Sequence, residues 1–280
     1  MLHTLLPSIL GSVPAAAAES AVLSNGPVRL TFEPSSHVYT VVDGRTGRTW
    51  TLAAPPDAFR ASQVGAMTHD AFTVRFEDAS TGAGYRCRVS LQPDAVLTFE
   101  ISAEDRNAPF TGLAYPPAPR ADLAHGRMLF CDRAGGNYVP LNDPKFSNYR
   151  LTVYANTDAL DMPWFGIVDD ETGEGLMLLF ETPTEATVLV RPDPEGRGWP
   201  QPAWFDSFKT FSYDRRVSYR FTATGGYVAQ AQAFRRWAEE QGWVKTLEAK
   251  AKERPRVEWL RGAADIWGAS GLEFALEARA

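Results

Sequence analysis

Residues 28–52 read VRLTFEPSSHVYTVVDGRTGRTWTL, and the pattern of this stretch indicates antiparallel β structure. Val28, Leu30 and Phe32 alternate with polar residues, the two-residue period of a strand that buries one face. Apolar residues recur in 38–42 and 48–52 on either side of a turn segment with two glycines, which tolerate the backbone angles of a tight turn. The stretch therefore predicts one strand followed by a β-hairpin.

Similar strand patterns continue through most of the chain. They fall at 72–76, 85–91, 95–101, 127–131, 151–154, 164–168, 176–181, 186–190, 209–213 and 218–222. No convincing helical period occurs between residues 25 and 224, and the short spacing of the strands favours a meander over β-α-β units. We predict a mainly-β fold, a large antiparallel two-sheet sandwich with each sheet burying one face.

The period changes to that of a helix after residue 225. Apolar residues are spaced helically over 227–238, and Gly242 suits the position just after a helix end. A second helix is predicted over about 244–253, ended by Pro255.

The last residues predict a short strand at 265–267 and then a helix. Ser270 and Glu273 have the spacing of a capping box. Because one strand and one helix cannot bury their own apolar faces, we expect them to be the first unit of a longer β/α domain. The expected organisation is a leader at 1–20, a β domain at 21–224, a helical linker at 225–262 and a truncated β/α unit at 263–280.

Charge and composition exclude several classes of protein. The net charge of −6 disfavours a nucleic-acid partner, which needs a basic surface. No apolar run is long enough for a membrane span. The four histidines and two cysteines lack metal-site spacing, and no nucleotide-binding motif occurs, so no metal or cofactor is expected. Cys87 alternates with inward residues and suits a buried free thiol, although a long-range disulfide with Cys131 stays open.

Residues 5–18 form a modest apolar run that ends in alanines, as secretory signals do. This favours a secreted or periplasmic protein. No Lys or Arg precedes Arg29, so a disordered Ala-rich leader is the alternative.

Trp199 and Trp204 stand among Gly and Pro residues, which predicts a loop at 193–206. Their rings would stack on the apolar faces of sugars, with Asp206 or Arg197 binding hydroxyl groups. The alternative is that both indoles cover the end of the sandwich, since buried Trp is common in β cores. Asp158 and Asp161 could line a pocket, but a turn before a buried strand favours Asp in any case.

Four stretches resemble one family of enzymes. They are residues 30–50, residues 131–143, Asp161-Met-Pro-Trp-Phe-Gly-Ile-Val168 and residues 234–267, of which the last is the most specific. They are similar to the N-terminal part of glycoside hydrolases in which a β-supersandwich of the galactose-mutarotase type precedes a (β/α)8 barrel, in a bacterial group related to endo-α-N-acetylgalactosaminidases. Cys131 and Arg133 depart from the family pattern, which has Pro and Gly there.

The resemblance implies a non-catalytic domain that braces a barrel and contributes to carbohydrate binding. The catalytic carboxylates of such enzymes lie on barrel strands outside this sequence, so no catalytic residue is assigned. Asp265 and Trp267 would end the first barrel strand, where barrel active sites form, or else be a capping Asp and a packing Trp. A stand-alone carbohydrate-binding module and a mutarotase-like epimerase using His69 and His125 are the alternatives.

Overall fold

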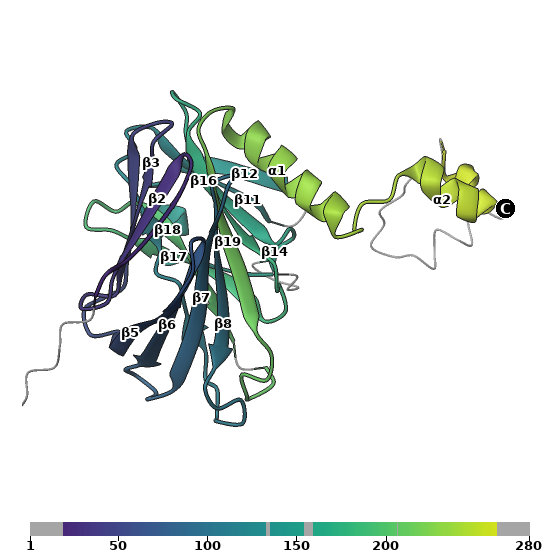
Figure 1. Ribbon diagram of the computed structural model, residues 1–280. Helices are drawn as coiled ribbons and strands as arrows, with labels where there is room; N and C mark the ends of the chain where they lie inside the picture. The colour runs from purple at the N-terminus through teal and green to yellow at the C-terminus, as the bar shows by residue number, and fades with distance from the viewer. Residues whose placement is uncertain (1–18, 133–134, 154–158, 206, 262–280) are drawn as a thin grey trace, which may run out of the picture. The chain divides into compact units, whose positions relative to one another are not determined.

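The computed structural model describes residues 19–132, 135–153, 159–205 and 207–261. The chain divides into two units, Met1–Ala231 and Gln232–Ala280. The mainly-β prediction is confirmed, but the first unit holds three sheets instead of the expected two (Figure 1).

The first small sheet contains the hairpin that residues 38–52 predict. Its five strands lie in the order β1 (Ala21–Asn25), β2 (Val28–Glu33), β3 (Val38–Asp43), β4 (Arg48–Ala53) and β10 (Pro119–Arg120). All pairs are antiparallel, with Leu30 opposite Val41 and Val41 opposite Trp50.

The large sheet contains nine antiparallel strands. Their order is β12 (Gly135–Pro140), β11 (Gly126–Asp132), β15 (Trp164–Asp169), β16 (Gly175–Phe180), β19 (Arg215–Thr222), β8 (Val96–Ala103), β7 (Gly84–Gln92), β6 (Ala71–Asp78) and β5 (Phe59–Met67). Strand β19 joins the two halves of this sheet, since it pairs with β16 on one side and β8 on the other.

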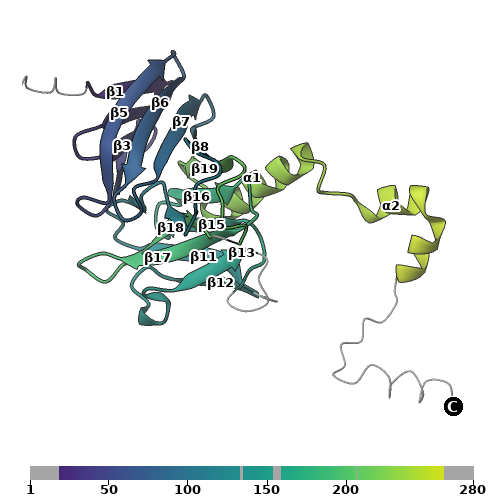
Figure 2. The same cartoon turned by 90° about the horizontal axis from the view of Figure 1, so that it is seen from below.

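The second small sheet has the order β14 (Ala159–Leu160), β13 (Arg150–Val153), β17 (Ala186–Pro192), β18 (Gly198–Trp204) and β9 (Leu113–Ala114). Its pairs are antiparallel except β13 with β14. Figure 2 shows β13 and β17 near β11 and β12, at the opposite end of the unit from β5 and β6.

The core lies between the large sheet and the two small sheets. Tyr39 of β3 meets Phe99 of β8, with ring centroids 5.3 Å apart. In the same way Trp204 of β18 meets Phe180 of β16 at 5.8 Å. In Figure 1 the purple strands of the first small sheet face β6, β7 and β8. Both small sheets therefore cover one face of the large sheet, which buries the alternating apolar residues of all three.

Helix α1 (Gly226–Glu240) begins in the first unit, where Gln230 is fully buried against the large sheet. The Gln230 amide donates to the carbonyl of Ile167, 2.9 Å away, and a Cβ at Gly166 would collide with the Gln230 side chain. Glycine on β15 thus permits the close approach of the helix.

In the second unit, Gly242 ends α1 as the sequence predicts. Its φ is +73°, and the amides of Gly242 and Trp243 donate to the carbonyls of Glu239 and Ala238, the paired bonds of a Schellman motif. Helix α2 (Leu247–Glu253) begins three residues later than predicted, because Thr246 caps it. The 3-10 turns are η1 (Pro144–Phe146) and η2 (Pro255–Leu260).

Two sequence expectations about strands are wrong. Residues 209–213 form no strand and make a single bridge, between Thr210 and Pro109. The loop predicted at 193–206 contains the buried strand β18. The truncated β/α unit at 263–280 lies outside the described residues, as does nearly all of the leader.

Candidate functional site

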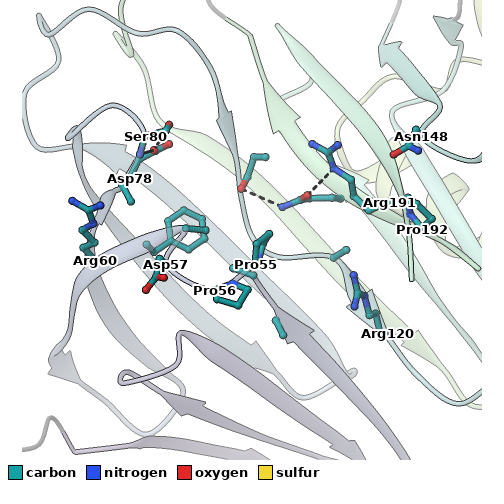
Figure 3. A pocket seen from close by; sticks show the side chains of 18 residues that line it. Pro55, Pro56, Asp57, Arg60, Asp78, Ser80, Arg120, Asn148, Arg191 and Pro192 are labelled. Carbon is teal, nitrogen blue, oxygen red and sulfur yellow. Dashed lines mark hydrogen bonds between the residues drawn. The ribbon is translucent and has the colours of Figure 1, made fainter. Parts of the chain in front are cut away.

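A cavity of about 860 Å³ lies where the two small sheets meet (Figure 3). Its wall comes from the segment between β4 and β5, from β9, β10, β17 and β18, and from the turns at Ser80 and Asn148. The size is that of pockets that hold small organic ligands. We call it the seam cavity.

Three arginines line the seam cavity: Arg60, Arg120 and Arg191. Among the described residues, none of the three has a carboxylate within ion-pair distance, whereas Arg75 and Arg216 each have one. These guanidinium groups are therefore free to bind an anion or several hydroxyl groups.

Gln201 holds Arg191 in place. The two residues are diagonal neighbours on β17 and β18, since Arg191 lies opposite Trp199. Gln201 is only 8% exposed; its Oε1 accepts from Nε of Arg191 at 3.4 Å, and its Nε2 donates to the carbonyl of Ala114 at 3.3 Å. The terminal nitrogens of Arg191 are left for a ligand.

Arg120 stands at the end of β10. Its Nε is buried and has no hydrogen-bond partner among the described residues. This buried Nε is not open to a ligand, so Arg120 would contact a bound anion through the terminal nitrogens of its guanidinium group. Figure 3 places Arg120 and Arg191 on the same side of the cavity.

The acidic residues lie at the other end of the seam cavity, with Arg60 (Figure 3). The Asp78 carboxylate caps its own turn, accepting from the Ser80 amide at 2.8 Å and the Ser80 hydroxyl at 2.6 Å. Asp57 is exposed and accepts no hydrogen bond from a described residue. Hydrolysis of a glycosidic bond uses two carboxyl groups, and of the two in this lining Asp78 already caps a turn through Oδ1.

A second cavity, of about 730 Å³, shares the segment 54–60 with the first and is bordered by His37. Nδ1 of His37 bonds to the Ser62 hydroxyl at 2.6 Å, and Phe32, Phe59 and Tyr115 surround the ring. Burial lowers the pKa of His37 to about 3, so the imidazole is neutral at pH 7. His37 packs the core and is poorly suited to act as a proton donor near neutral pH.

The two tryptophans predicted to bind sugar are core residues. Trp199 is 0% exposed and its indole donates to the Asp193 carboxylate at 2.8 Å; Trp204 is 1% exposed and donates to the Thr182 carbonyl at 3.3 Å. Stacking on a sugar needs an open ring face, which neither has. The alternative, that both cover the sandwich, fits their burial.

The other predicted site residues have separate outcomes. Arg197, proposed beside the tryptophans, is held by Asp193 at 2.8 Å. Asp206, Asp265, Trp267 and Asp158 lie outside the described residues, so their roles stay predictions.

The structure does not bring His69 and His125 together. His69 lies between β5 and β6, and His125 lies just before β11, six strand positions away in the large sheet. At about 4.8 Å per strand the separation is about 29 Å. His125 instead pairs with Glu171 at 3.1 Å. A shared epimerase site is incompatible with this placement.

Other features of the described residues are as follows. Cys87 and Cys131 are free, so the disulfide left open by the sequence does not form; Cys87 is a buried thiol, as predicted. No cluster of His, Cys, Asp and Glu in the described ranges is arranged to hold a metal ion. Within those ranges, neither helix has the length and apolarity to cross a bilayer.

Comparison with known proteins identifies the fold. No family model and no curated protein matches the chain. The α-N-acetylgalactosaminidase NagBb from Bifidobacterium bifidum in complex with GalNAc superposes with a TM-score of 0.70 and 18% identity, over 86% of this chain and 42% of that one. Its ligand-free form gives a TM-score of 0.68 and 18% identity, over 84% of this chain and 41% of that one.

A GalM/aldose epimerase homologue from C. elegans superposes with a TM-score of only 0.44 and 9% identity, over 74% of this chain and 100% of that one. At 18% identity the NagBb matches show the fold alone. The chain has a β-sandwich fold that is shared with a bacterial glycosidase, and it spans about two fifths of the length of the NagBb structures.

Proposed function

We propose that this chain is the β-supersandwich region of a glycoside hydrolase, where it braces a catalytic barrel and contributes a carbohydrate-binding surface. The observation that carries the proposal is the match to NagBb, which covers most of this chain and less than half of the glycosidase. A region that makes up part of a longer enzyme explains both figures.

The seam cavity supports a binding role without catalysis. It offers guanidinium and amide donors, which suit sugar hydroxyl and carboxyl oxygens, around an apolar lining of Ala and Pro. Glycoside hydrolysis uses a pair of carboxyl groups, whereas here Asp78 caps a turn and only Asp57 accepts no hydrogen bond from a described residue. We therefore assign no catalytic residue to this chain.

The helical unit supports the bracing role. Trp243, Leu247, Trp259 and Leu260 are exposed there, Trp259 by 77%. Exposed side chains of this size offer apolar area that further polypeptide could cover. A barrel domain would be such a partner.

A stand-alone carbohydrate-binding module is the second candidate, and the seam cavity favours it equally. The two are separated by the size of the native protein. Antibodies raised against the 280-residue chain should precipitate from its source organism a polypeptide well above 30.8 kDa. That polypeptide should hydrolyse at least one member of a panel of aryl glycosides, while the 280-residue chain hydrolyses none.

A native polypeptide of about the calculated mass that binds glycans would establish the binding module instead. Hydrolysis by the 280-residue chain itself would overturn the proposal. The same antibodies test the expected export, because cell fractionation should place the protein in the periplasm or the medium.

A further inference from the structure

We propose that the seam cavity binds the carboxylate of an acidic sugar, such as a hexuronate, between Arg120 and Arg191. This inference rests on the proposed role in carbohydrate binding and adds the class of ligand. The proposal is supported by the contacts within the cavity, by its charge and by its lining.

The Arg191 guanidinium is oriented for a carboxylate. Gln201 accepts from Nε, and neither terminal nitrogen of Arg191 has a hydrogen-bond partner among the described residues. Gln201 is itself anchored to the Ala114 carbonyl, so the arrangement is fixed before a ligand arrives. A guanidinium presented in this way matches a planar carboxylate with two parallel hydrogen bonds.

Arg120 supplies the second positive charge on the same side of the cavity (Figure 3). Two guanidinium groups that share one wall repel each other, and no described carboxylate neutralises them. The positive charge of this wall contrasts with the chain as a whole, whose net charge is −6. A bound anion would remove the repulsion between the two guanidinium groups.

The opposite end of the cavity gives the ligand a direction. Asp57 and Arg60 both lie there, and they can bind sugar hydroxyl groups, Asp57 as a hydrogen-bond acceptor and Arg60 as a donor. Between the two ends the lining is small and apolar, with Pro55, Pro56 and Ala118. The ligand that fits has one anionic end, an apolar ring face and a hydroxylated end.

The test is calorimetric titration of the 280-residue chain with matched pairs of sugars. Galacturonate and glucuronate should bind at least tenfold more tightly than galactose and glucose, and more weakly as salt is raised. Inorganic sulfate forms a further arm. Because sulfate lacks the ring, it should bind at least tenfold more weakly than galacturonate.

The variant Arg191→Gln should weaken galacturonate binding about 10- to 100-fold, since a hydrogen bond between charged groups is worth that factor. Arg120→Gln should do the same. Arg86→Gln is the matched control, because Arg86 is exposed on β7, away from the cavity, and the charge change is identical. Circular dichroism of each variant shows whether the fold is kept.

Gln201→Glu gives a second route to the same answer. The new carboxylate would form an ion pair with Arg191 and compete with the ligand for it. Galacturonate binding should therefore fall, although Glu has nearly the same shape as Gln. Uronates that bind no better than neutral sugars, or an Arg191→Gln variant that binds like Arg86→Gln, would overturn the inference. Sulfate binding as tightly as galacturonate would overturn it as well, in favour of a simple anion site.

Failure here is distinguishable from failure of the proposed function. Neutral sugars that bind as well as uronates would leave the carbohydrate role intact and remove only the acidic ligand. The native size and hydrolysis described above do not depend on the seam cavity at all.

Discussion

Replacing Trp199 with alanine separates a core tryptophan from a sugar-binding one. The side chain is fully buried on β18, where Trp199 lies opposite Arg191 of β17. An aromatic side chain of this kind buries about 150–250 Å², worth about 4–6 kcal/mol at about 25 cal/mol per Å². Partial collapse of the site brings the expected cost of Trp199→Ala to about 3–5 kcal/mol.

Trp199→Phe is the matched variant. It keeps a ring in the core and loses the hydrogen bond from the indole to Asp193, which is worth about 1.5–3 kcal/mol because the acceptor is charged. Urea unfolding followed by far-ultraviolet circular dichroism should rank stability as wild type, then Trp199→Phe, then Trp199→Ala. A Trp199→Ala protein within 1 kcal/mol of wild type that no longer binds glycans would refute burial and restore the stacking role.

Three further predictions follow from buried groups. Glu185 and Arg215 form a buried ion pair with 2.5 Å between Oε2 and Nη2. Glu185→Gln should lower the free energy of unfolding in urea by about 3–5 kcal/mol, because it leaves the Arg215 charge buried without its partner. A loss under 1 kcal/mol would mean that water already reaches the pair. Burial raises the pKa of the Cys87 thiol, so Ellman's reagent at pH 8 should leave Cys87 unmodified in the folded protein. In urea the reagent should modify both Cys87 and Cys131. Rapid reaction of both thiols in the native protein would argue against this packing. The folded-state pKa of His37 is lowered to about 3, so on acidification the unfolded chain takes up this proton before the folded chain does. The free energy of unfolding should therefore fall by about 1.4 kcal/mol per pH unit below pH 6.5. His37→Asn should flatten this slope between pH 6.5 and 5, and an unchanged slope would exclude His37 as its source.

Half-buried strands could be predicted from sequence because one period governs them. In β2 and β4 the alternation of apolar and polar residues matches the alternation of more and less buried side chains. In β3 burial also alternates, but the exposed Val42 and the buried Asp43 depart from the apolar pattern. The same pattern does not predict β5 and β12, the two edge strands of the large sheet. Both bury little, and β12 opens with two glycines that indicate a turn.

Strand β18 was missed for a different reason. Pro200 and Pro202 argue against a strand, because proline cannot donate to a neighbouring strand. Successive residues direct their amides to opposite edges, so both prolines face the same edge. That edge is the one away from β17, since the amide of Gly198 also points away from β17 and donates to Leu141. Strand β9, which lies on that edge, pairs only with Ala203 and Trp204, so neither proline deprives a neighbouring strand of a hydrogen bond.

The candidate site could not be predicted from sequence. Arg60, Arg120, Arg191 and Gln201 are far apart in the chain and form no motif with a spacing of its own. They meet only because β10 pairs with β4 while β9 pairs with β18, which brings the edges of the two small sheets together. Aromatic residues among glycines and prolines gave the stronger local signal, and it pointed to core residues.

A crystal structure of the 280-residue chain soaked with galacturonate tests the assignment of the seam cavity most directly. We expect the sugar in that cavity, with its carboxylate oxygens within hydrogen-bond distance of Arg191 and Arg120 and its hydroxyl groups toward Asp57. Galacturonate bound elsewhere on the protein, or bound in the cavity with its carboxylate turned away from both arginines, would contradict it.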